Sequence, residues 1–251
     1  KAFLIDLDGC VYSGSRLMPG AAEFISRLRR DGKKVLFLSN NSTHTLRQIS
    51  DKLGGMGIET EPGGILTPLA VCGEFLARQK GICKVFVLGT RALREAVEQA
   101  GHTLSDEQAD AIVCGRDLDF AYTRFERAGK LLAGGAYFLL TNEDLSHPSE
   151  DGLPVPEAGA FAEALTAVTG RTPDEAIGKP RPWLYEIALN RLGVSADQSV
   201  MIGDNALTDI VGGHNAGLTT VHVASSPAPN PVVAPDYYVP NFNQLLEMMD
   251  R

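Results

Sequence analysis

Two carboxylates stand close together near the start of the chain. Asp6 and Asp8 directly follow Ala2-Phe3-Leu4-Ile5, an apolar run typical of a buried strand. Residues two apart in a strand lie on the same face, and like charges held this close raise each other's proton affinity unless a cation lies between them. Ligands of open α/β sheets bind outside the carboxyl ends of the strands, where Gly9 would allow close backbone approach. The pair therefore indicates a site for a ligand or a cation, although a plain strand-end turn uses the same residue types.

Three further polar segments also follow apolar runs. Each has a simpler explanation when taken alone, namely a helix cap, a solvated lysine or a strand-end turn. Together they supply what phosphoryl transfer requires: a carboxylate nucleophile, hard oxygen ligands for a cation, and hydroxyl, N–H or ammonium groups around the phosphate charge. We therefore predict that all four segments form one site. The residues of the later segments are Ser39 with Asn40, Lys179, and Asp204 with Asp209.

Four sequence motifs occur in a characteristic order: DLDGCVY at 6–12, LSNNS at 38–42, IGKP at 177–180 and GDNALTDI at 203–210. With them the chain resembles the haloacid dehalogenase superfamily, specifically its NagD-like phosphatases with a type IIA cap, over nearly its whole length. The resemblance implies an α/β fold, in which a Rossmann-like doubly wound parallel sheet forms the core and an α/β cap domain is inserted. It also implies that Asp6 is the nucleophile that forms an aspartyl-phosphate. Asp8 would be the acid for the leaving alcohol and then the base for water.

The same resemblance implies roles for the other motif residues. Ser39 and Asn40 would bind the phosphoryl oxygens, and Lys179 would neutralise charge between those oxygens and the nucleophile. One Mg²⁺ ion is implied as cofactor, with Asp209 orienting its shell mostly from the second sphere. The residues assigned to the metal are Asp6, Asp204, Asp209 and, through its backbone carbonyl, Asp8.

A weaker resemblance concerns substrate recognition. The segment from Thr141 to Pro148 is similar to the TN-x-D segment of the family. His147 stands where pyridoxal-phosphate phosphatases of this branch have a substrate-facing histidine. Asn142 and His147 are therefore candidates for substrate contact, whereas the simpler interpretation makes His147 a surface group beside a proline.

The spacing of the motifs predicts the domain organisation. Residues 9–18 leave no room for a domain after the first motif, whereas residues 40–178 separate Ser39 from Lys179. A core of alternating strands and helices is complete by about Gly57. We predict a catalytic core at 1–67 and 174–251 and an inserted specificity cap at 68–173. The proline-rich stretch at 224–231 is predicted to be a connector before an edge strand at 237–239.

Composition bounds the partners. The formal net charge is −8, and there are no blocks of Lys and Arg, which argues against nucleic acid and anionic membrane as partners. No apolar run approaches the roughly 18 residues of a membrane-spanning helix. Four scattered cysteines without a C-x-x-C pair favour reduced thiols and a cytoplasmic location. Because Lys1 is not an initiator Met and the first strand begins at once, we expect further residues before it.

The sequence thus predicts a Mg²⁺-dependent hydrolase of a small phosphorylated metabolite. Candidate substrates are pyridoxal phosphate, nucleoside monophosphates, phosphoglycolate and glycerol phosphate. A phosphotransferase or mutase of the same superfamily is the nearer alternative, but those enzymes usually carry the cap after the first motif. A non-enzymatic phospho-receiver switch is the other alternative, but receivers lack the Asp-x-Asp pair and a large cap. A homo-oligomer formed through the cap is left open.

Overall fold

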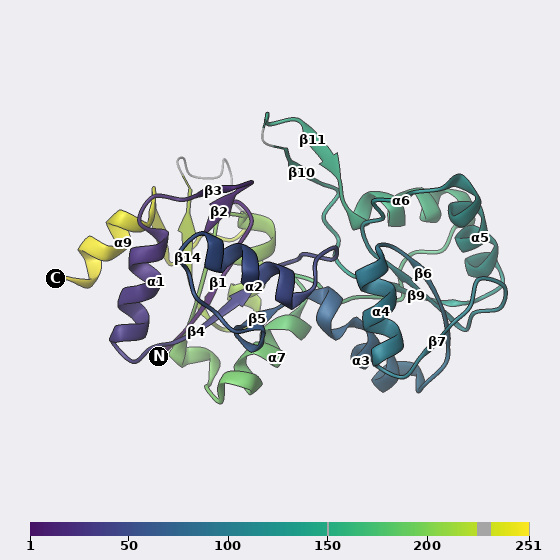
Figure 1. Ribbon diagram of the computed structural model, residues 1–251, viewed down its shortest axis with the longest axis horizontal. Coiled ribbons are helices and arrows are strands. Elements are labelled where there is room, and N and C mark those ends of the chain that lie inside the picture. Colours follow the sequence, from purple (N-terminus) through teal and green to yellow (C-terminus); the bar gives the residue numbers. More distant parts are fainter. Residues whose placement is uncertain (150, 225–231, 251) are drawn as a thin grey trace. The chain divides into compact units, whose positions relative to one another are not determined.

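The protein folds into two compact units, seen in a computed structural model that describes residues 1–149, 151–224 and 232–250 (Figure 1). The first unit comprises residues 1–39, 46–66 and 179–251, and the second comprises residues 40–45 and 67–178. The second unit continues past the predicted cap end at 173, because β12 (Glu175–Ala176) pairs with β9 (Tyr137–Leu140). Beyond Ala224, the predicted proline-rich connector lies outside the described residues.

A parallel sheet of six strands organises the first unit. Its order is β15-β14-β13-β1-β4-β5, so that β1 lies between β13 and β4. Parallel strands covered on both faces are almost continuously apolar, which explains why the first strand reads AFLI and its neighbour KVLFL. The strands are β1 (Ala2–Ile5), β4 (Lys34–Leu38), β5 (Ile65–Leu66), β13 (Ser199–Gly203), β14 (Thr219–Val223) and β15 (Tyr237–Val239).

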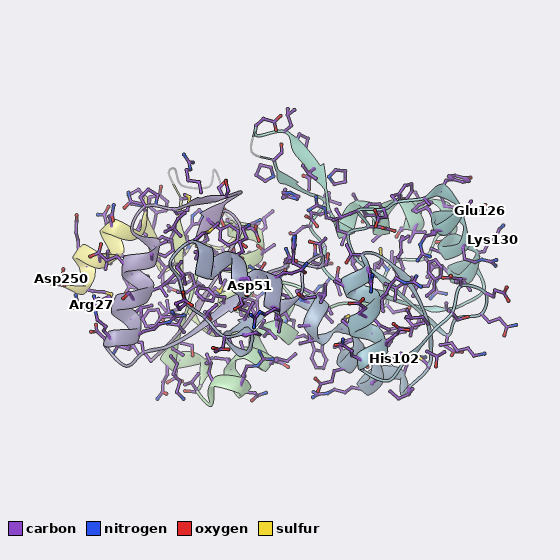
Figure 2. The ribbon with its side chains drawn as sticks, in the orientation of Figure 1. Arg27, Asp51, His102, Glu126, Lys130 and Asp250 are labelled. Carbon is purple, nitrogen blue, oxygen red and sulfur yellow. The ribbon has the colours of Figure 1, made fainter. Side chains whose placement is uncertain are left out.

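Helices with apolar faces cover this sheet. The helix at Ala21–Arg30 buries residues 21, 24, 25 and 28, the spacing of one helical face. There Phe24 packs against Phe242, with ring centroids 5.4 Å apart, and Arg27 forms an ion pair of 3.0 Å with Asp250 (Figure 2). The helices are α1 (Ala21–Arg30), α2 (Leu46–Gly55), α7 (Pro182–Leu192), α8 (Val211–Asn215) and α9 (Phe242–Met249). The remaining elements are the small hairpin β2 (Tyr12–Ser13) with β3 (Arg16–Leu17), the 3₁₀ turns Pro62–Gly64 and Ala196–Gln198, and the π-helical turn Ala206–Ile210.

The second unit has its own parallel sheet, in the order β12-β9-β8-β6-β7. Two helix pairs pack on this sheet, α3 with α4 and α5 with α6 (Figure 1). An antiparallel hairpin of β10 (Ser146–Pro148) and β11 (Pro154–Pro156) projects from this unit. The remaining elements are β6 (Lys84–Leu88), β7 (Thr103–Leu104), β8 (Ala111–Cys114), α3 (Pro68–Lys80), α4 (Arg91–Gln99), α5 (Tyr122–Ala133) and α6 (Ala158–Thr169). In the described parts of both units, no helix has both the length and the apolar character needed to span a membrane.

Candidate active site

The polar residues that end neighbouring strands meet at one edge of the first sheet. Ile5 of β1 pairs with Ile202 of β13 on one side and with Phe37 of β4 on the other. Because these strands are parallel and in register, the residues that follow them emerge from the same edge. Asp6, Ser39 and Asp204 are those residues, and both Asp6 and Ser39 are buried.

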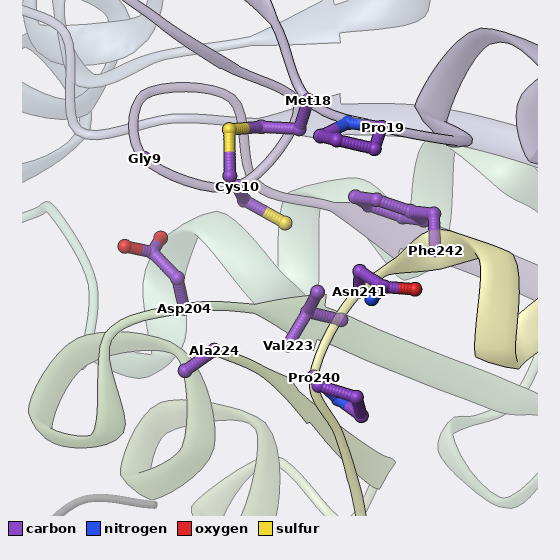
Figure 3. Close-up of a pocket in the computed structure, with 10 residues that line it drawn as sticks. All are labelled: Gly9, Cys10, Met18, Pro19, Asp204, Val223, Ala224, Pro240, Asn241 and Phe242. Carbon is purple, nitrogen blue, oxygen red and sulfur yellow. The ribbon is translucent and has the colours of Figure 1, made fainter. Parts of the chain in front are cut away.

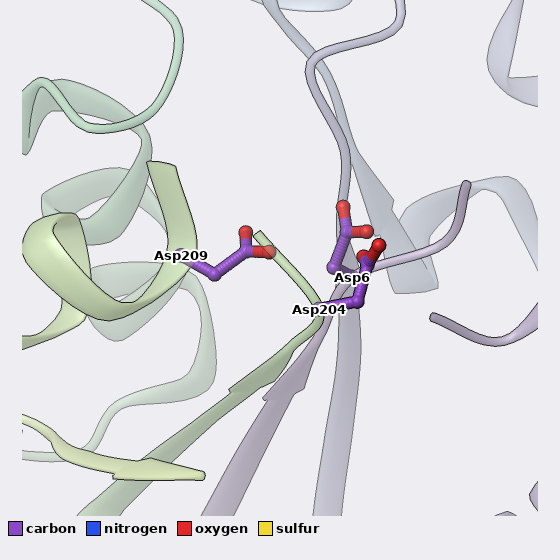
Figure 4. Close-up of side chains that lie close together, drawn as sticks. All are labelled: Asp6, Asp204 and Asp209. Atoms are coloured by element: carbon purple, nitrogen blue, oxygen red, sulfur yellow. The ribbon is translucent and has the colours of Figure 1, made fainter. Parts of the chain in front are cut away.

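Three carboxylates gather at this edge. Asp6, Asp204 and Asp209 each place an oxygen within 4.8 Å of the other two, with Asp6 and Asp204 directly after adjacent strands and Asp209 on a helical turn (Figure 4). In the part of the chain that the structure describes, Asp204 Oδ1 is buried without a hydrogen-bond partner. Hard carboxylate oxygens in such a cluster suit Mg²⁺, and a buried oxygen without a hydrogen-bond partner has a lone pair free to bind a cation. The residues therefore fit the implied metal.

A buried ammonium compensates part of this negative charge. Lys179 Nζ lies 2.5 Å from Asp6 Oδ1 and 2.6 Å from Asp209 Oδ1, and the lysine side chain is only 2% exposed. Burial by itself lowers the pKa of Lys179, but the charges of Asp209 and Asp6 outweigh burial and raise that pKa well above its usual value. The lysine therefore stays charged in the interior of the first unit.

The pKa values of Asp6 and Asp204 are raised as well, but here burial is the main cause. Burial raises the pKa of Asp6 well above its usual value, against the attraction of Lys179, and the charges of Asp209 and Asp204 raise it further. Burial, followed by the charge of Asp209, raises the pKa of Asp204 to about 7. One lysine is thus insufficient for two buried carboxylates and a third that is half-buried, which is a second reason why this cluster favours an additional cation.

A distorted helical turn positions Asp209. Residues Ala206–Ile210 form a π-helical turn, a feature often found at functional sites. The turn is held by the Tyr185 hydroxyl, which donates to Thr208 O at 3.0 Å, and by the Asn205 N–H, which donates to Asp209 Oδ2 at 3.1 Å. Gly203 is required beside it, because a Cβ atom at that position would collide with the Asp209 carboxylate.

Asp8 lies in a different environment from the three clustered carboxylates. Its side chain is exposed, and its Oδ2 accepts a hydrogen bond of 3.3 Å from the Tyr12 hydroxyl. The next residue, Gly9, has a φ of 92°, and a Cβ atom there would collide with the Asp204 carboxylate. The turn after β1 therefore needs glycine both for its backbone conformation and for its close approach to Asp204.

A pocket of about 210 Å³ opens beside Asp204 (Figure 3). Apart from Asp204 and Asn241, its walls are mainly apolar or backbone, which contributes to the desolvation of this carboxylate. Cys10 also borders it, and burial raises the pKa of this thiol well above its usual value, so the thiol is neutral. The lining residues are Gly9, Cys10, Met18, Pro19, Asp204, Val223, Ala224, Pro240, Asn241 and Phe242.

The predicted phosphate-binding segment is divided between the units. Ser39 belongs to the first unit, where its N–H donates to Leu66 O at 3.1 Å. Asn40 belongs to the second unit, where its side-chain amide donates to Asp144 Oδ2 at 2.9 Å. Asn142 Nδ2 in turn donates to Asn40 O at 3.0 Å. The structure thus groups Asn40 with Asn142, and its assignment to phosphate stays a prediction.

His147 lies on the hairpin of the second unit. Its Nδ1 is 2.7 Å from Glu157 Oε1, and the Arg116 guanidinium donates to the same oxygen at 3.2 Å. Burial raises the pKa of Glu157, whereas Arg116 and His147 act to lower it. The histidine side chain is 40% exposed, so it is neither a buried structural group nor a freely solvated one.

Sequence reasoning missed several partners of the predicted residues. It assigned Asp209 to the metal shell but did not predict its direct contact with Lys179. It also missed Tyr12 as the partner of Asp8 and Glu157 as the partner of His147. The contact of Tyr185 with the turn that carries Asp209 was missed as well. Only Tyr12 had a usable signal, because it follows Asp8 by one short turn.

Known proteins resemble the chain throughout its length. The sequence model of the haloacid dehalogenase-like hydrolases matches residues 3–103, and a second model, for HAD-hydrolase-like proteins, matches residues 176–245. The 5'-nucleotidase YutF of Bacillus subtilis is 37% identical over 89% of this chain and 86% of its own. An acid sugar phosphatase of Staphylococcus aureus is 34% identical over 100% of this chain and 98% of its own.

Solved structures agree with these relatives. The 4-nitrophenylphosphatase of Thermotoga maritima superposes with a TM-score of 0.92 and 32% identity, covering 98% of this chain and 96% of that one. NagD from Escherichia coli K-12 superposes with a TM-score of 0.87 and 28% identity, covering 96% of both chains. These two solved structures therefore share the fold of this chain, and one of them is named as a phosphatase and the other as NagD.

Proposed function

This chain belongs to the haloacid dehalogenase-like hydrolases, as a phosphatase of their NagD-like branch, and from that premise we propose Mg²⁺-dependent hydrolysis of a small phosphomonoester through an aspartyl-phosphate on Asp6. The observation that carries the proposal is the buried contact of Lys179 with Asp6 and Asp209 beside the unsatisfied oxygen of Asp204. A structural ion pair between Lys179 and one aspartate does not explain why two further carboxylates lie beside a single ammonium. A site that binds both a cation and a dianionic phosphoryl group does explain this arrangement.

The proposed reaction consists of two successive in-line displacements at phosphorus, in which residues of the first unit have separate roles. Asp6 attacks phosphorus, and the bond to the leaving oxygen breaks with its electron pair remaining on that oxygen, which takes a proton from the Asp8 carboxylic acid. Water then attacks the phosphoryl group and gives its proton to the Asp8 carboxylate, while the bond to Asp6 breaks and restores its carboxylate. Lys179 and Ser39 bind phosphoryl oxygens during both displacements. Mg²⁺ held by Asp6, Asp204 and the Asp8 carbonyl, with Asp209 orienting this shell mostly from the second sphere, would lower the repulsion between carboxylate and phosphate.

We assign substrate selection to the second unit, with Asn142 and His147 as its candidate contacts. The core residues handle the phosphate and the metal, so specificity for the leaving group has to come from elsewhere. The names of the relatives favour a nucleoside monophosphate or a sugar phosphate. Pyridoxal phosphate, phosphoglycolate and glycerol phosphate remain among the candidate substrates to be tested. Release of inorganic phosphate from each compound with Mg²⁺, compared with EDTA, tests both substrate and metal.

Asp6→Asn tests the nucleophile. The amide keeps the shape of the side chain but cannot attack phosphorus, so turnover should fall by at least about three orders of magnitude, roughly 4 kcal/mol of barrier. Asp51→Asn, which changes an exposed carboxylate of α2, is the matched control and should retain parental turnover. Activity of Asp6→Asn above about a tenth of the parent would overturn the covalent route.

A further inference from the structure

The Asp8 carboxylate has a single side-chain anchor. Its side chain is exposed, so it is not fixed by packing as Asp6 is. Tyr12 is the one side chain in the described ranges, 1–149, 151–224 and 232–250, that hydrogen bonds to it, through the phenol hydroxyl and Oδ2 at 3.3 Å. An exposed carboxylate without an anchor would occupy several rotamers, each with its oxygens in a different place.

Tyr12 itself is held firmly. Its side chain is only 2% exposed, and its N–H donates to Leu7 O at 3.1 Å, while the Gly9 N–H donates to Tyr12 O at 2.7 Å. The ammonium of Lys52 lies 3.7 Å from the centre of its ring, a favourable cation–π contact. Burial, together with the charges of Asp8 and Asp6, raises the Tyr12 pKa far above its usual value, so the hydroxyl keeps its proton. A hydroxyl fixed in place therefore donates a hydrogen bond to the Asp8 carboxylate.

We propose that Tyr12 is the positioning residue for the acid–base group, holding Asp8 Oδ2 so that Oδ1 exchanges the proton with the leaving alcohol and then with water. This inference rests on the proposed function, which gives Asp8 that task. Proton transfer needs a heavy-atom distance of about 2.6–3.2 Å between the acid and the oxygen that it protonates. The rate of this step therefore falls in proportion to the time that the acid spends in other rotamers. Tyr12 does not touch the reacting atoms, and its whole effect passes through Asp8.

The leaving group gives this proposal a specific readout. An alkoxide is expelled with difficulty, so the first displacement from glycerol phosphate depends on the proton from Asp8. Nitrophenolate is a stable anion and leaves p-nitrophenyl phosphate with little help. The ratio kcat/KM reports steps up to the first irreversible one, here formation of the phosphoenzyme, and is therefore insensitive to the later use of Asp8 as base.

Tyr12→Phe removes only the hydroxyl and keeps the ring under Lys52. We expect kcat/KM to fall about tenfold or more for glycerol phosphate and less than about threefold for p-nitrophenyl phosphate. Tyr137→Phe is the matched control, because Tyr137 lies in β9 of the second unit and also carries a lysine, Lys80, 5.4 Å from its ring centre. It should leave both values unchanged. A general loss of folded protein in Tyr12→Phe would lower kcat/KM for both substrates by the same factor. Equal losses for the two substrates, or no loss for either, therefore overturn the positioning role.

A double-mutant cycle with Asp8→Asn completes the test. If Tyr12 acts only through Asp8, adding Tyr12→Phe to Asp8→Asn costs less than about twofold in the single-turnover release of glycerol, and a further loss of about tenfold would mean that it acts elsewhere. The same experiment distinguishes a failure of the proposed function from a failure of the positioning role of Tyr12. If Asp8→Asn alone releases glycerol at the parental rate, the acid–base role in the proposed function is wrong. If that variant is impaired but Tyr12→Phe shows no preference between leaving groups, only the present inference is wrong.

Discussion

Replacing Lys179 by Met should destabilise the first unit strongly. The ammonium lies between Asp6 and Asp209, all three side chains are at least nine-tenths buried, and Met fills a similar volume without charge. Removing one partner of a buried ion pair leaves uncompensated charge in the interior, which costs about 3–5 kcal/mol. For a protein of this size each kcal/mol lowers Tm by about 2–4 °C, so we expect Tm to fall by roughly 6–20 °C in EDTA.

Magnesium should reverse part of this loss. The variant keeps three carboxylates but no ammonium, so a divalent cation has more charge to neutralise there than in the parent. A ligand that binds only the folded state stabilises it by RT ln(1 + [L]/Kd), so tighter binding gives a larger rise in Tm. Added MgCl₂ should therefore raise the Tm of Lys179→Met more than that of the parent.

Thermal unfolding followed by circular dichroism, with EDTA and with MgCl₂, measures both effects. Arg47→Met is the matched control, because Arg47 pairs with Asp51 at 3.0 Å but its side chain is 76% exposed. Exposed pairs within a helix contribute about 0.3–0.5 kcal/mol, so the control should unfold close to the parent. A Lys179→Met variant as stable as the parent in EDTA, or equally responsive to magnesium, would refute the charge-balance argument.

Three other changes test further parts of the site. Asp204→Asn should weaken Mg²⁺ affinity at least about tenfold in isothermal titration, since an anionic ligand is lost, and unchanged affinity would remove Asp204 from the metal site. His147→Ala should change the order of kcat/KM among the candidate substrates while sparing p-nitrophenyl phosphate, and an identical order would make the histidine a bystander. Gly203→Ala should cost about 1–3 kcal/mol in the free energy of unfolding because its Cβ meets the Asp209 carboxylate, and an unchanged denaturation midpoint would contradict that clash.

The strand ends could be predicted because their signals are local. An apolar run followed by Asp6 or by Asp204 marks both the strand and the point at which polar chemistry begins, and a parallel sheet then brings such ends together. The predicted α/β fold is confirmed by the two parallel sheets and by the related structures. Helix α1 has an equally local signal, because its apolar positions follow one helical face.

The choice of partners could not be read in the same way. Lys179 contacts Asp6 from 173 positions away, and no periodic pattern relates the two. Which of Asp204 and Asp209 the lysine would contact depends on the π-helical turn, and such a turn has no clear sequence signal. Asn40 followed the pattern of a helix cap beside Ser39, yet its side chain is bonded to Asp144, because packing in three dimensions outweighs local preference.

The charge balance at Asp6, Asp204, Asp209 and Lys179 also has a consequence for the order in which ligands bind. Three carboxylates against one ammonium leave an excess of negative charge, so free phosphate meets repulsion there, whereas a divalent cation meets attraction. Each ligand therefore raises the affinity for the other, and by reciprocity the two factors are equal. Inorganic phosphate, the reaction product, should then leave more readily when magnesium is scarce, so the metal concentration governs product retention as well as chemistry.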